Sequence, residues 1–350
     1  MKKVVVGLLS LILLGIGGFF VIFFMETASV SRDVTPINFE IKKGETYLTI
    51  AKRLKDENLI KSDFFYKLFI KINKPDSVQA GIYTLSEAMS VNDIVEVLKK
   101  GNNYNPDIVT FTIPEGKHLE EIAEIISSKT NHTKEELLDY WNDDNFIDSV
   151  IDDYWFVTDN VKQKGIRYAL EGYFYPDTYE ILNKDVDPSI IAYKMLNQME
   201  LVLENYKDDI KSSKYSIHEL LTMASIIEHE AILDEDRKVI ASVFYNRLDS
   251  NMKLQSCATI GYAIDDWKLT YSAVDLQTDS PYNTYYYSGL PIGPGNMPSK
   301  KSIEASLYPD ETEYLYFLAN VCDVNDNTTY FSKDYNEHVS KKNKYLTCVN

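Results

Sequence analysis

The sequence has few cysteines, few histidines and no metal-binding spacing. Its 350 residues include three cysteines, at Cys257, Cys322 and Cys348, and five dispersed histidines. Three cysteines are too few for a disulfide framework, so one Cys322–Cys348 bridge and three free thiols are the two alternatives. No CxxC or HExxH spacing occurs, so the sequence predicts neither a metal site nor a cofactor.

Basic residues are also in short supply. The chain has 36 Lys and Arg against 53 Asp and Glu, which gives a formal net charge of −17. A protein that binds nucleic acid normally presents a basic face, so nucleic acid is not expected as a partner. The 45% of hydrophobic and 25% of charged residues are an ordinary balance for a globular protein, and the length is sufficient for two or three domains.

One long uncharged run lies at the N-terminus. The 22 residues from Val4 to Met25 contain no charge, and a run of this length can cross a bilayer. The alternative is a cleaved signal peptide, whose apolar region would be shorter and would end at a small-x-small site. We expect a single transmembrane helix within residues 1–25. Lys2 and Lys3 then place the N-terminus in the cytoplasm and the rest of the chain outside, on the cell membrane.

An internal repeat follows a polar linker at residues 26–37. Five residues of one copy recur 72 positions later, and the pairs are Phe39 and Phe111, Ile41 and Ile113, Gly44 and Gly116, Ile50 and Ile122, and Ala51 and Ala123. Each copy predicts a short strand, a turn at the glycine, and an amphipathic helix. The helices carry the repeated Ile-Ala pair, followed by Leu54 in the first copy and Ile126 in the second.

The first copy resembles the LysM glycan-binding module. The resemblance rests on the segment Lys43–Ala51, which has the strand, Gly-acidic-Thr turn and Ile-Ala helix of that module. We expect this unit to span residues 38–105, with a closing strand at Gln79–Leu85 and a helix at Val91–Leu98. A packing or spacer domain is the alternative, because a LysM-like fold need not bind sugar. A second repeat-like segment is expected at residues 106–165.

The segment Met223–Glu230 places a carboxylate at the end of an apolar stretch. A capping box at Ser216–Glu219 predicts a helix that carries Glu228 on the same face as Ala224. The helical neighbours of Glu228 are small, which leaves room for a ligand, and apolar walls would raise the pKa of its carboxyl as a general acid requires. The alternative is that Glu228 is the first solvent-facing residue after a buried helix.

The charged residues around this helix receive structural interpretations. Glu230 lies about 200° around the helix from Glu228, so we interpret it as an ion-pair or capping residue. The run Asp234–Asp236 precedes the next apolar-periodic stretch and is predicted to cap that helix. Arg247 is expected to pair with an acidic side chain as part of the structural framework.

Three segments together resemble the MltG/YceG family of endolytic murein transglycosylases. They are Glu171–Tyr179; Ala224–Glu230 with Val243–Leu248 and Leu254–Ser256; and Ser280–Tyr285 with Gly289–Pro291. Their order and spacing extend the resemblance over nearly the full chain. The sequence departs from the family pattern at Cys257-Ala258, where many relatives have Asp-Pro, and at Ile292, where a second Pro is usual.

The resemblance implies an α+β protein with a YceG-like catalytic domain over residues 166–350. Such a domain cuts the β-1,4 bond between N-acetylmuramic acid and N-acetylglucosamine within peptidoglycan glycan strands and leaves 1,6-anhydromuramic ends. This cleavage ends the elongation of nascent strands beside the peptidoglycan synthases. The family pattern assigns the acid and base role to Glu228. Substrate contacts are expected from Glu171, Tyr175, Asp177, Gln255, Ser256, Asn283, Thr284 and Tyr285.

Two other functions compete with this one. A hydrolytic muramidase would share the substrate and the acid, but it normally needs two carboxylates on either side of the bond, whereas a lytic transglycosylase needs one. A non-catalytic scaffold would bind the wall and recruit synthases without cutting glycan.

Overall fold

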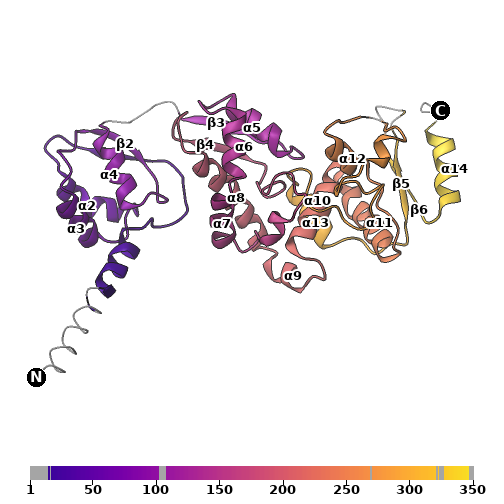
Figure 1. The fold of residues 1–350 in the computed structure, drawn as a ribbon, viewed down its shortest axis with the longest axis horizontal. Coiled ribbons are helices and arrows are strands. Elements are labelled where there is room, and N and C mark those ends of the chain that lie inside the picture. Colours follow the sequence, from indigo (N-terminus) through magenta and orange to yellow (C-terminus); the bar gives the residue numbers. More distant parts are fainter. Residues whose placement is uncertain are drawn as a thin grey trace, which may run out of the picture. The chain divides into compact units, whose positions relative to one another are not determined.

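The chain divides into two units. The computed structural model describes residues 15, 17–101, 108–268, 270–320, 322 and 327–346 (Figure 1). Unit 1 comprises residues 1–110 and 180–194, and unit 2 comprises residues 111–179 and 195–350. This division differs from the expected boundaries, because it joins most of the predicted 106–165 segment to the predicted catalytic region.

Unit 1 contains two strands and three helices with complete bounds. They are β1 (Ile37–Ile41), α2 (Tyr47–Asp56), α3 (Asp63–Asn73), β2 (Gly81–Leu85) and α4 (Val91–Lys99). The strands pair antiparallel, with Phe39 opposite Tyr83. Capping boxes at Thr46 and Ser90 start α2 and α4. The first strand, its turn and helix, the closing strand and the last helix are therefore confirmed, whereas α3 was not expected from the repeat.

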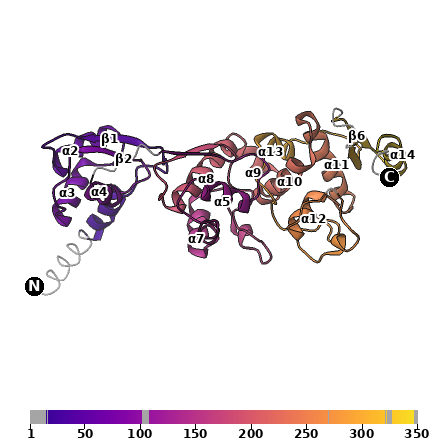
Figure 2. The ribbon, with the colours of Figure 1, turned by 90° about the horizontal axis from the view of Figure 1, so that it is seen from above.

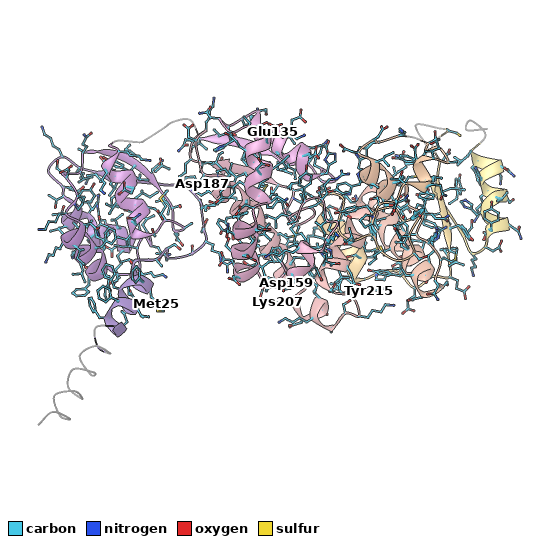
Figure 3. All side chains as sticks on the ribbon, viewed as in Figure 1. Met25, Glu135, Asp159, Asp187, Lys207 and Tyr215 are labelled. Atoms are coloured by element: carbon cyan, nitrogen blue, oxygen red, sulfur yellow. The ribbon has the colours of Figure 1, made fainter. Side chains whose placement is uncertain are left out.

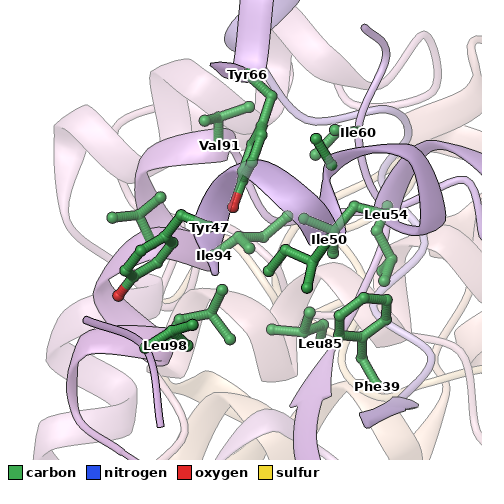
Figure 4. Close-up of a cluster of buried hydrophobic side chains, with 14 of the residues drawn as sticks. Phe39, Tyr47, Ile50, Leu54, Ile60, Tyr66, Leu85, Val91, Ile94 and Leu98 are labelled. Carbon is green, nitrogen blue, oxygen red and sulfur yellow. The ribbon is translucent and has the colours of Figure 1, made fainter. Parts of the chain in front are cut away.

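The core of unit 1 lies between the strand pair and the helices (Figures 2 and 4). Ile50, Ala51 and Leu54 of α2 are completely buried there. Gly44 has φ +90°, a left-handed conformation that glycine adopts without a steric penalty, and this turn directs α2 back over the strands. The periodicity of the sequence thus identified the buried face of α2 correctly.

The second repeat copy has the same local structure. β3 (Val109–Thr112) leads through Gly116, at φ +74°, into α5 (Leu119–Ser127). Ile122, Ala123 and Ile126 are completely buried, like their counterparts in α2. β3 pairs with β4 (Thr178–Ile181), and α8 (Pro188–Glu204) follows β4 as α4 follows β2. The predicted repeat is confirmed.

Unit 2 holds most of the helices. Its further elements are α6 (Lys134–Trp141), α7 (Asp144–Asp153), η1 (Asp159–Lys162), α9 (Lys207–Ser212), α10 (Ile217–Glu230), η2 (Asp234–Asp236), α11 (Arg237–Asp249), α12 (Cys257–Ile264), η3 (Asp275–Gln277), α13 (Lys300–Leu307), β5 (Tyr316–Ala319), β6 (Thr329–Ser332) and α14 (Tyr335–Tyr345). Helices α10, α11 and α13 pack against one another (Figure 1). β5 pairs antiparallel with β6, and α14 packs on both strands.

The N-terminal helix is described only in part. Residues 17–27 are helical, and Met25 lies in its last turn (Figure 3). Within the described ranges, no helix is both long enough and apolar enough to cross a membrane. Residues 1–14 and 16, which belong to the predicted anchor, lie outside those ranges. The transmembrane helix therefore stays a prediction.

The cysteines are not all free. Cys322 is disulfide-bonded, and Cys257 is an exposed free thiol. The alternative of three free thiols is therefore wrong. Cys348, the partner that the sequence offered for Cys322, lies outside the described residues.

Candidate active site

Helix α10 carries two acids in its last turn. It begins at the predicted capping box, in which Ser216 accepts a hydrogen bond from the backbone of Glu219 and the Glu219 side chain accepts one from the backbone of Ser216. Every residue from Ile217 to Ile227 except Glu219 is buried, so this helix forms the centre of the unit. The helix ends at Glu230. Because two residues span about 200°, Glu228 and Glu230 point to opposite sides of α10.

Glu228 is held by groups of the protein itself. Its Oε2 lies 3.2 Å from Nη1 of Arg237 and accepts a hydrogen bond of 2.8 Å from the backbone N–H of Ser299. Its Oε1 accepts a hydrogen bond of 3.3 Å from Nη2 of Arg237. The Glu228 side chain is 7% exposed and that of Arg237 is 10% exposed. Both carboxylate oxygens are therefore occupied in a nearly buried ion pair.

The surroundings of Glu228 differ from the apolar, spacious site that the sequence predicted. One small residue on its side of α10, Ser225, contacts residues 295 and 296 of the protein itself. Ser225 Oγ accepts a hydrogen bond of 3.2 Å from the N–H of Gly295, and the Ser225 carbonyl accepts one of 2.8 Å from the Asn296 amide. A Cβ added to Gly116 would lie 3.7 Å from Cγ of Glu228. The solvent-facing alternative also fails, because the side chain is nearly buried.

Glu230 lies at the start of another helix. Its Oε1 accepts a hydrogen bond of 2.5 Å from Ser256 Oγ, and its carboxylate also accepts from the backbone N–H groups of Cys257 and Ala258. Ser256 is the N-cap of α12, so Glu230 accepts hydrogen bonds from N–H groups that have no partner within that helix. Burial raises the pKa of Glu230 above its usual range, although the hydrogen bonds oppose this shift. The predicted capping role is confirmed, but the capped helix is α12.

Glu230 also lines a cavity of about 400 Å³. The wall combines the end of α10 with α11, the 254–257 loop, β5 and α14. Its lining residues are Glu230, Phe244, Arg247, Leu254, Gln255, Ser256, Cys257, Tyr285, Tyr316, Phe317, Leu318, Ala319, Tyr335 and His338. Aromatic rings and a few polar groups around one acid are typical of a site that binds sugar.

Three of the predicted substrate residues meet at this cavity, and they are Gln255, Ser256 and Tyr285. Gln255 has φ +53°, a left-handed conformation that is uncommon for residues other than glycine. Its N–H donates a hydrogen bond of 3.2 Å to the carbonyl of Thr284, which holds the loop in place. The Tyr285 hydroxyl lies 3.3 Å from Sγ of Cys257.

Comparison with known proteins agrees with the predicted family. Residues 39–344 match the model of the YceG-like family. An endolytic murein transglycosylase of Bacillus subtilis is 38% identical over 317 residues, which are 90% of this chain and 86% of that protein. The chain belongs to the YceG-like family. Its Streptococcus pneumoniae D39 relative, also named an endolytic murein transglycosylase, is 34% identical over 95% of this chain, but the match covers 63% of the streptococcal protein.

A solved YceG-like structure has the same fold. The crystal structure of a yceG-like protein from Listeria monocytogenes is 38% identical and has a TM-score of 0.63. The match covers 88% of this chain and 99% of the Listeria chain. The described helices and strands and this match together show an α+β, YceG-like fold.

Two other predicted substrate residues form the framework behind the cavity. The amide of Asn283 donates to the carbonyls of Leu276 and Thr278, at 3.2 and 2.8 Å, and its Oδ1 accepts from the N–H groups of Tyr285 and Tyr286. Thr284 Oγ1 accepts from the N–H of Ser256 and shares a hydrogen bond with Thr259. Both side chains are 1% exposed. In this YceG-like chain they shape the loops that carry Ser256 and Tyr285, and direct substrate contact is not supported.

Glu171 lies elsewhere, at the start of α5. Both of its oxygens accept from the N–H of Leu119, at 3.0 and 3.1 Å, and Oε2 also accepts from the Tyr262 hydroxyl at 3.0 Å. The residue is 2% exposed, and burial raises its pKa to about 8. In the structure Glu171 is a buried residue that caps the start of α5, and it does not line the cavity of Glu230.

Tyr175 and Asp177 do not line the cavity either. Asp177 is exposed, and its carboxylate accepts from the N–H of Thr178 at 2.7 Å and from the Gln198 amide at 3.1 Å. Burial raises the pKa of Tyr175, and the negative charge of Glu115 adds to the shift. Burial and the negative charge of Glu228 raise the pKa of Glu115. Glu115 and Tyr175 therefore lie on the Glu228 side of α10.

Several residues of the cavity were missed or misread in the sequence. Arg247 was expected to pair with an acid, but its guanidinium donates to the carbonyls of Leu254 and Leu315, at 2.8 and 2.6 Å. His338 contributes a buried Nδ1 for which the structure gives no hydrogen-bond partner. The wall comes from six separate segments, so no spacing in the sequence could have identified it.

The acidic run after α10 does not cap α11. Asp236 makes no capping hydrogen bond. Asp234 instead pairs with Arg237 Nε at 3.1 Å and with Lys301. These contacts hold Arg237 beside Glu228. Among the described residues, no group of three or more His, Cys, Asp or Glu side chains is placed to hold a metal ion.

Proposed function

We propose that the chain is a lytic transglycosylase that cuts the MurNAc–GlcNAc β-1,4 bond within nascent peptidoglycan strands. The observation that carries this proposal is the geometry of Glu230, a half-buried carboxyl with a raised pKa that lines a cavity with tyrosine walls. Relatives named endolytic murein transglycosylases, at 34 and 38% identity, support the same reaction. The products would carry 1,6-anhydromuramic ends, and each cut would end elongation of one strand.

Glu230 serves better as the acid than Glu228. Glu228 accepts hydrogen bonds from Arg237 and Ser299, and Glu230 accepts them from Ser256 and the N-terminus of α12, but of the two acids Glu230 is the one that lines the cavity. Burial raises the pKa of Glu230, which favours the protonated form that a general acid uses. We therefore propose Glu230 as the acid, while the catalytic role that the family resemblance implies for Glu228 stays a prediction that the variants below test.

The reaction then needs one proton to leave Glu230 and one to return. Protonated Glu230 donates its proton to the glycosidic oxygen as the bond from that oxygen to C1 of the muramic sugar breaks. The resulting carboxylate takes the proton from the C6 hydroxyl of the same sugar, and the C6 oxygen bonds to C1. The substrate's acetamide and the polar groups of Gln255 and Tyr285 stabilise the positive charge that develops at C1.

The cavity favours this reaction over hydrolysis. Of the residues that line it, Glu230 is the sole carboxylate. An enzyme that uses water normally places a second carboxylate about 5 to 10 Å from the first. A transglycosylase uses the substrate's own hydroxyl as the nucleophile and needs no such partner. A non-catalytic scaffold would not require an acid such as Glu230 in a cavity.

The test compares two isosteric variants in the full chain, Glu230→Gln and Glu228→Gln. Purified sacculi or nascent strands are incubated with each variant, and mass spectrometry counts anhydromuramic and reducing ends. We expect Glu230→Gln to lower the rate of anhydro-end formation by about 10²- to 10⁴-fold, the usual contribution of a general acid. Glu228→Gln should keep far more activity when it is folded. Loss of activity in folded Glu228→Gln alone, or reducing ends in place of anhydro ends, would contradict the assignment.

We also propose that the chain is held on the cell membrane by residues 1–25, with both units outside. The uncharged run Val4–Met25 and the preceding lysines support this topology. The disulfide at Cys322 supports an oxidising compartment. Placement beside the membrane would bring the cavity to nascent strands and to the synthases that make them. Protease accessibility of residues 28–350 in intact spheroplasts tests the orientation.

Unit 1 is proposed to contact glycan as a LysM-like module. Its order of strand, two helices and antiparallel strand supports this interpretation. Sedimentation of the full chain with purified sacculi, compared with a variant that carries Asp at several exposed positions of unit 1, measures that contribution. A spacer role predicts equal binding by both proteins.

A further inference from the structure

Helix α3 presents an apolar outer face that no described part of unit 1 covers. Phe64 is 63% exposed and Ile72 is 62% exposed, whereas Tyr66 and Ile70 on the opposite side are buried in the core. Leu68 lies between Phe64 and Ile72 on the helix surface, because residues four apart share a face. We name Phe64, Leu68 and Ile72 the outer face of α3. Two large exposed apolar side chains one above the other indicate a contact surface.

This outer face adjoins the N-terminal helix. Phe23 stacks on Phe69 of α3, with ring centroids 6.4 Å apart and an interplanar angle of 12°. Phe19 and Phe23 both contact Phe65, at 6.3 and 6.2 Å. The Nζ of Lys61 donates to the carbonyl of Met25 at 3.3 Å. α3 therefore packs against the helix of residues 17–27, which contains the end of the uncharged run at Met25 (Figure 3).

The net charge of the α3 region is positive, whereas that of the whole chain is negative. Residues 61–74 contain four lysines, Lys61, Lys67, Lys71 and Lys74, and one acid, Asp63, so their net charge is 4 − 1 = +3. The whole chain carries −17. Lys67 pairs with Asp63 at 2.9 Å. Lys61 uses one of its three N–H donors on the Met25 carbonyl, and Lys61, Lys71 and Lys74 are all exposed. Exposed aromatic and aliphatic residues bordered by lysines are typical of helices that lie in a bilayer interface.

We propose that the outer face of α3 lies in the headgroup region of the same membrane that residues 1–25 enter. Phe64, Leu68 and Ile72 would bury their side chains at the boundary of headgroups and acyl chains. Lys61, Lys71 and Lys74 would bind anionic headgroups. This inference rests on the proposed anchor. It adds that unit 1 contacts the bilayer directly and is not attached to it through the anchor alone.

The test measures the depth of single tryptophans in the full chain reconstituted into vesicles with brominated lipids. Phe64→Trp reports on the outer face, and Phe20→Trp reports on the anchor. Ile82→Trp is the matched control, because Ile82 is 37% exposed on β2, away from helix 17–27 in Figures 1 and 2. The signal of the three native tryptophans is subtracted with the wild-type chain. All three substitutions replace exposed side chains, and circular dichroism verifies folding.

We expect lipids brominated near the glycerol end of the acyl chain to quench Phe64→Trp by about twofold, while Ile82→Trp is unaffected. Changing Lys61, Lys71 and Lys74 to Glu should reduce this quenching in anionic vesicles. Quenching of Phe20→Trp with none of Phe64→Trp would overturn the inference and leave the anchor intact. The same holds if Phe64→Trp is shielded from aqueous acrylamide but not reached by bromine, because a protein then covers the face. Absence of quenching at both Phe20→Trp and Phe64→Trp would overturn the anchor and this inference together.

Discussion

Replacing Glu171 with Gln should change how the stability of unit 2 depends on pH. Burial raises the pKa of Glu171 from 4.5 to about 8 in the folded chain. The group is therefore protonated in the folded state and ionised in the unfolded state over this range. Its contribution to stability is fully present below pH 4.5 and is lost as the pH rises through about 8. The difference of 3.5 units corresponds to at most about 5 kcal/mol, at about 1.36 kcal/mol per unit.

Glutamine keeps the shape and the contacts without the charge. Its amide oxygen can accept from the N–H of Leu119, and its NH₂ can donate to the hydroxyl of Tyr262. Glu171→Gln should therefore match the wild type near pH 5 and exceed its free energy of unfolding by several kcal/mol near pH 9.

Urea unfolding followed by tryptophan fluorescence measures this difference, because the three tryptophans all belong to unit 2. Glu235→Gln is the control, since it makes the same chemical change at an exposed position of η2. Parallel pH profiles for wild type and Glu171→Gln would refute the reasoning, because they would mean that ionised Glu171 is tolerated in the folded protein.

Three further predictions concern the two sides of α10 and the cavity. Ser256→Ala removes a hydrogen bond that lowers the pKa of Glu230, so the alkaline limb of the kcat/KM profile should move up by about one pH unit; a downward shift would contradict the role of Ser256. Arg237→Met leaves Glu228 nearly buried without its ion-pair partner and should lower the free energy of unfolding by about 3 kcal/mol in urea, with partial recovery when Glu228→Gln is added. Alkylation of Cys257 by iodoacetamide should block the cavity and reduce anhydro-end formation, and Cys257→Ser should be resistant to the reagent.

Local features of the fold could be predicted because neighbouring residues determine them. The capping box at Ser216 starts α10 where expected, and Gly44 and Gly116 take the left-handed turns that their repeated positions implied. The Ile-Ala pairs of both copies are buried because a helix of period 3.6 turns one stripe toward the core. α3 was not predicted, because the repeated residues end within the first helix of each copy.

The site could be predicted only in part, because its surroundings come from distant segments. Helical geometry correctly placed Glu228 and Glu230 on opposite sides of α10. It could not reveal which side had space. Ser225, beside Glu228, accepts hydrogen bonds from the backbone of Gly295 and the side chain of Asn296, whereas Glu230 lines a cavity whose wall includes β5 and α14. The position of Glu171 could not be predicted for a similar reason, since its hydrogen-bond donor is the N–H of Leu119 at the start of α5, 52 residues earlier in the chain.

The position of Glu230 suits a reaction that needs both of its protonation states. Burial alone would raise the pKa of a carboxyl and make it a poor base after it has donated its proton. The donors of Ser256 and of the α12 N-terminus oppose that effect, because they bind the carboxylate more strongly than the acid. Because burial raises the pKa of Glu230 and its hydrogen-bond donors lower it, the group can give a proton to the leaving oxygen and then take one from the C6 hydroxyl. Glu228 also accepts hydrogen bonds at both oxygens, from Arg237 and Ser299, but it does not line this cavity.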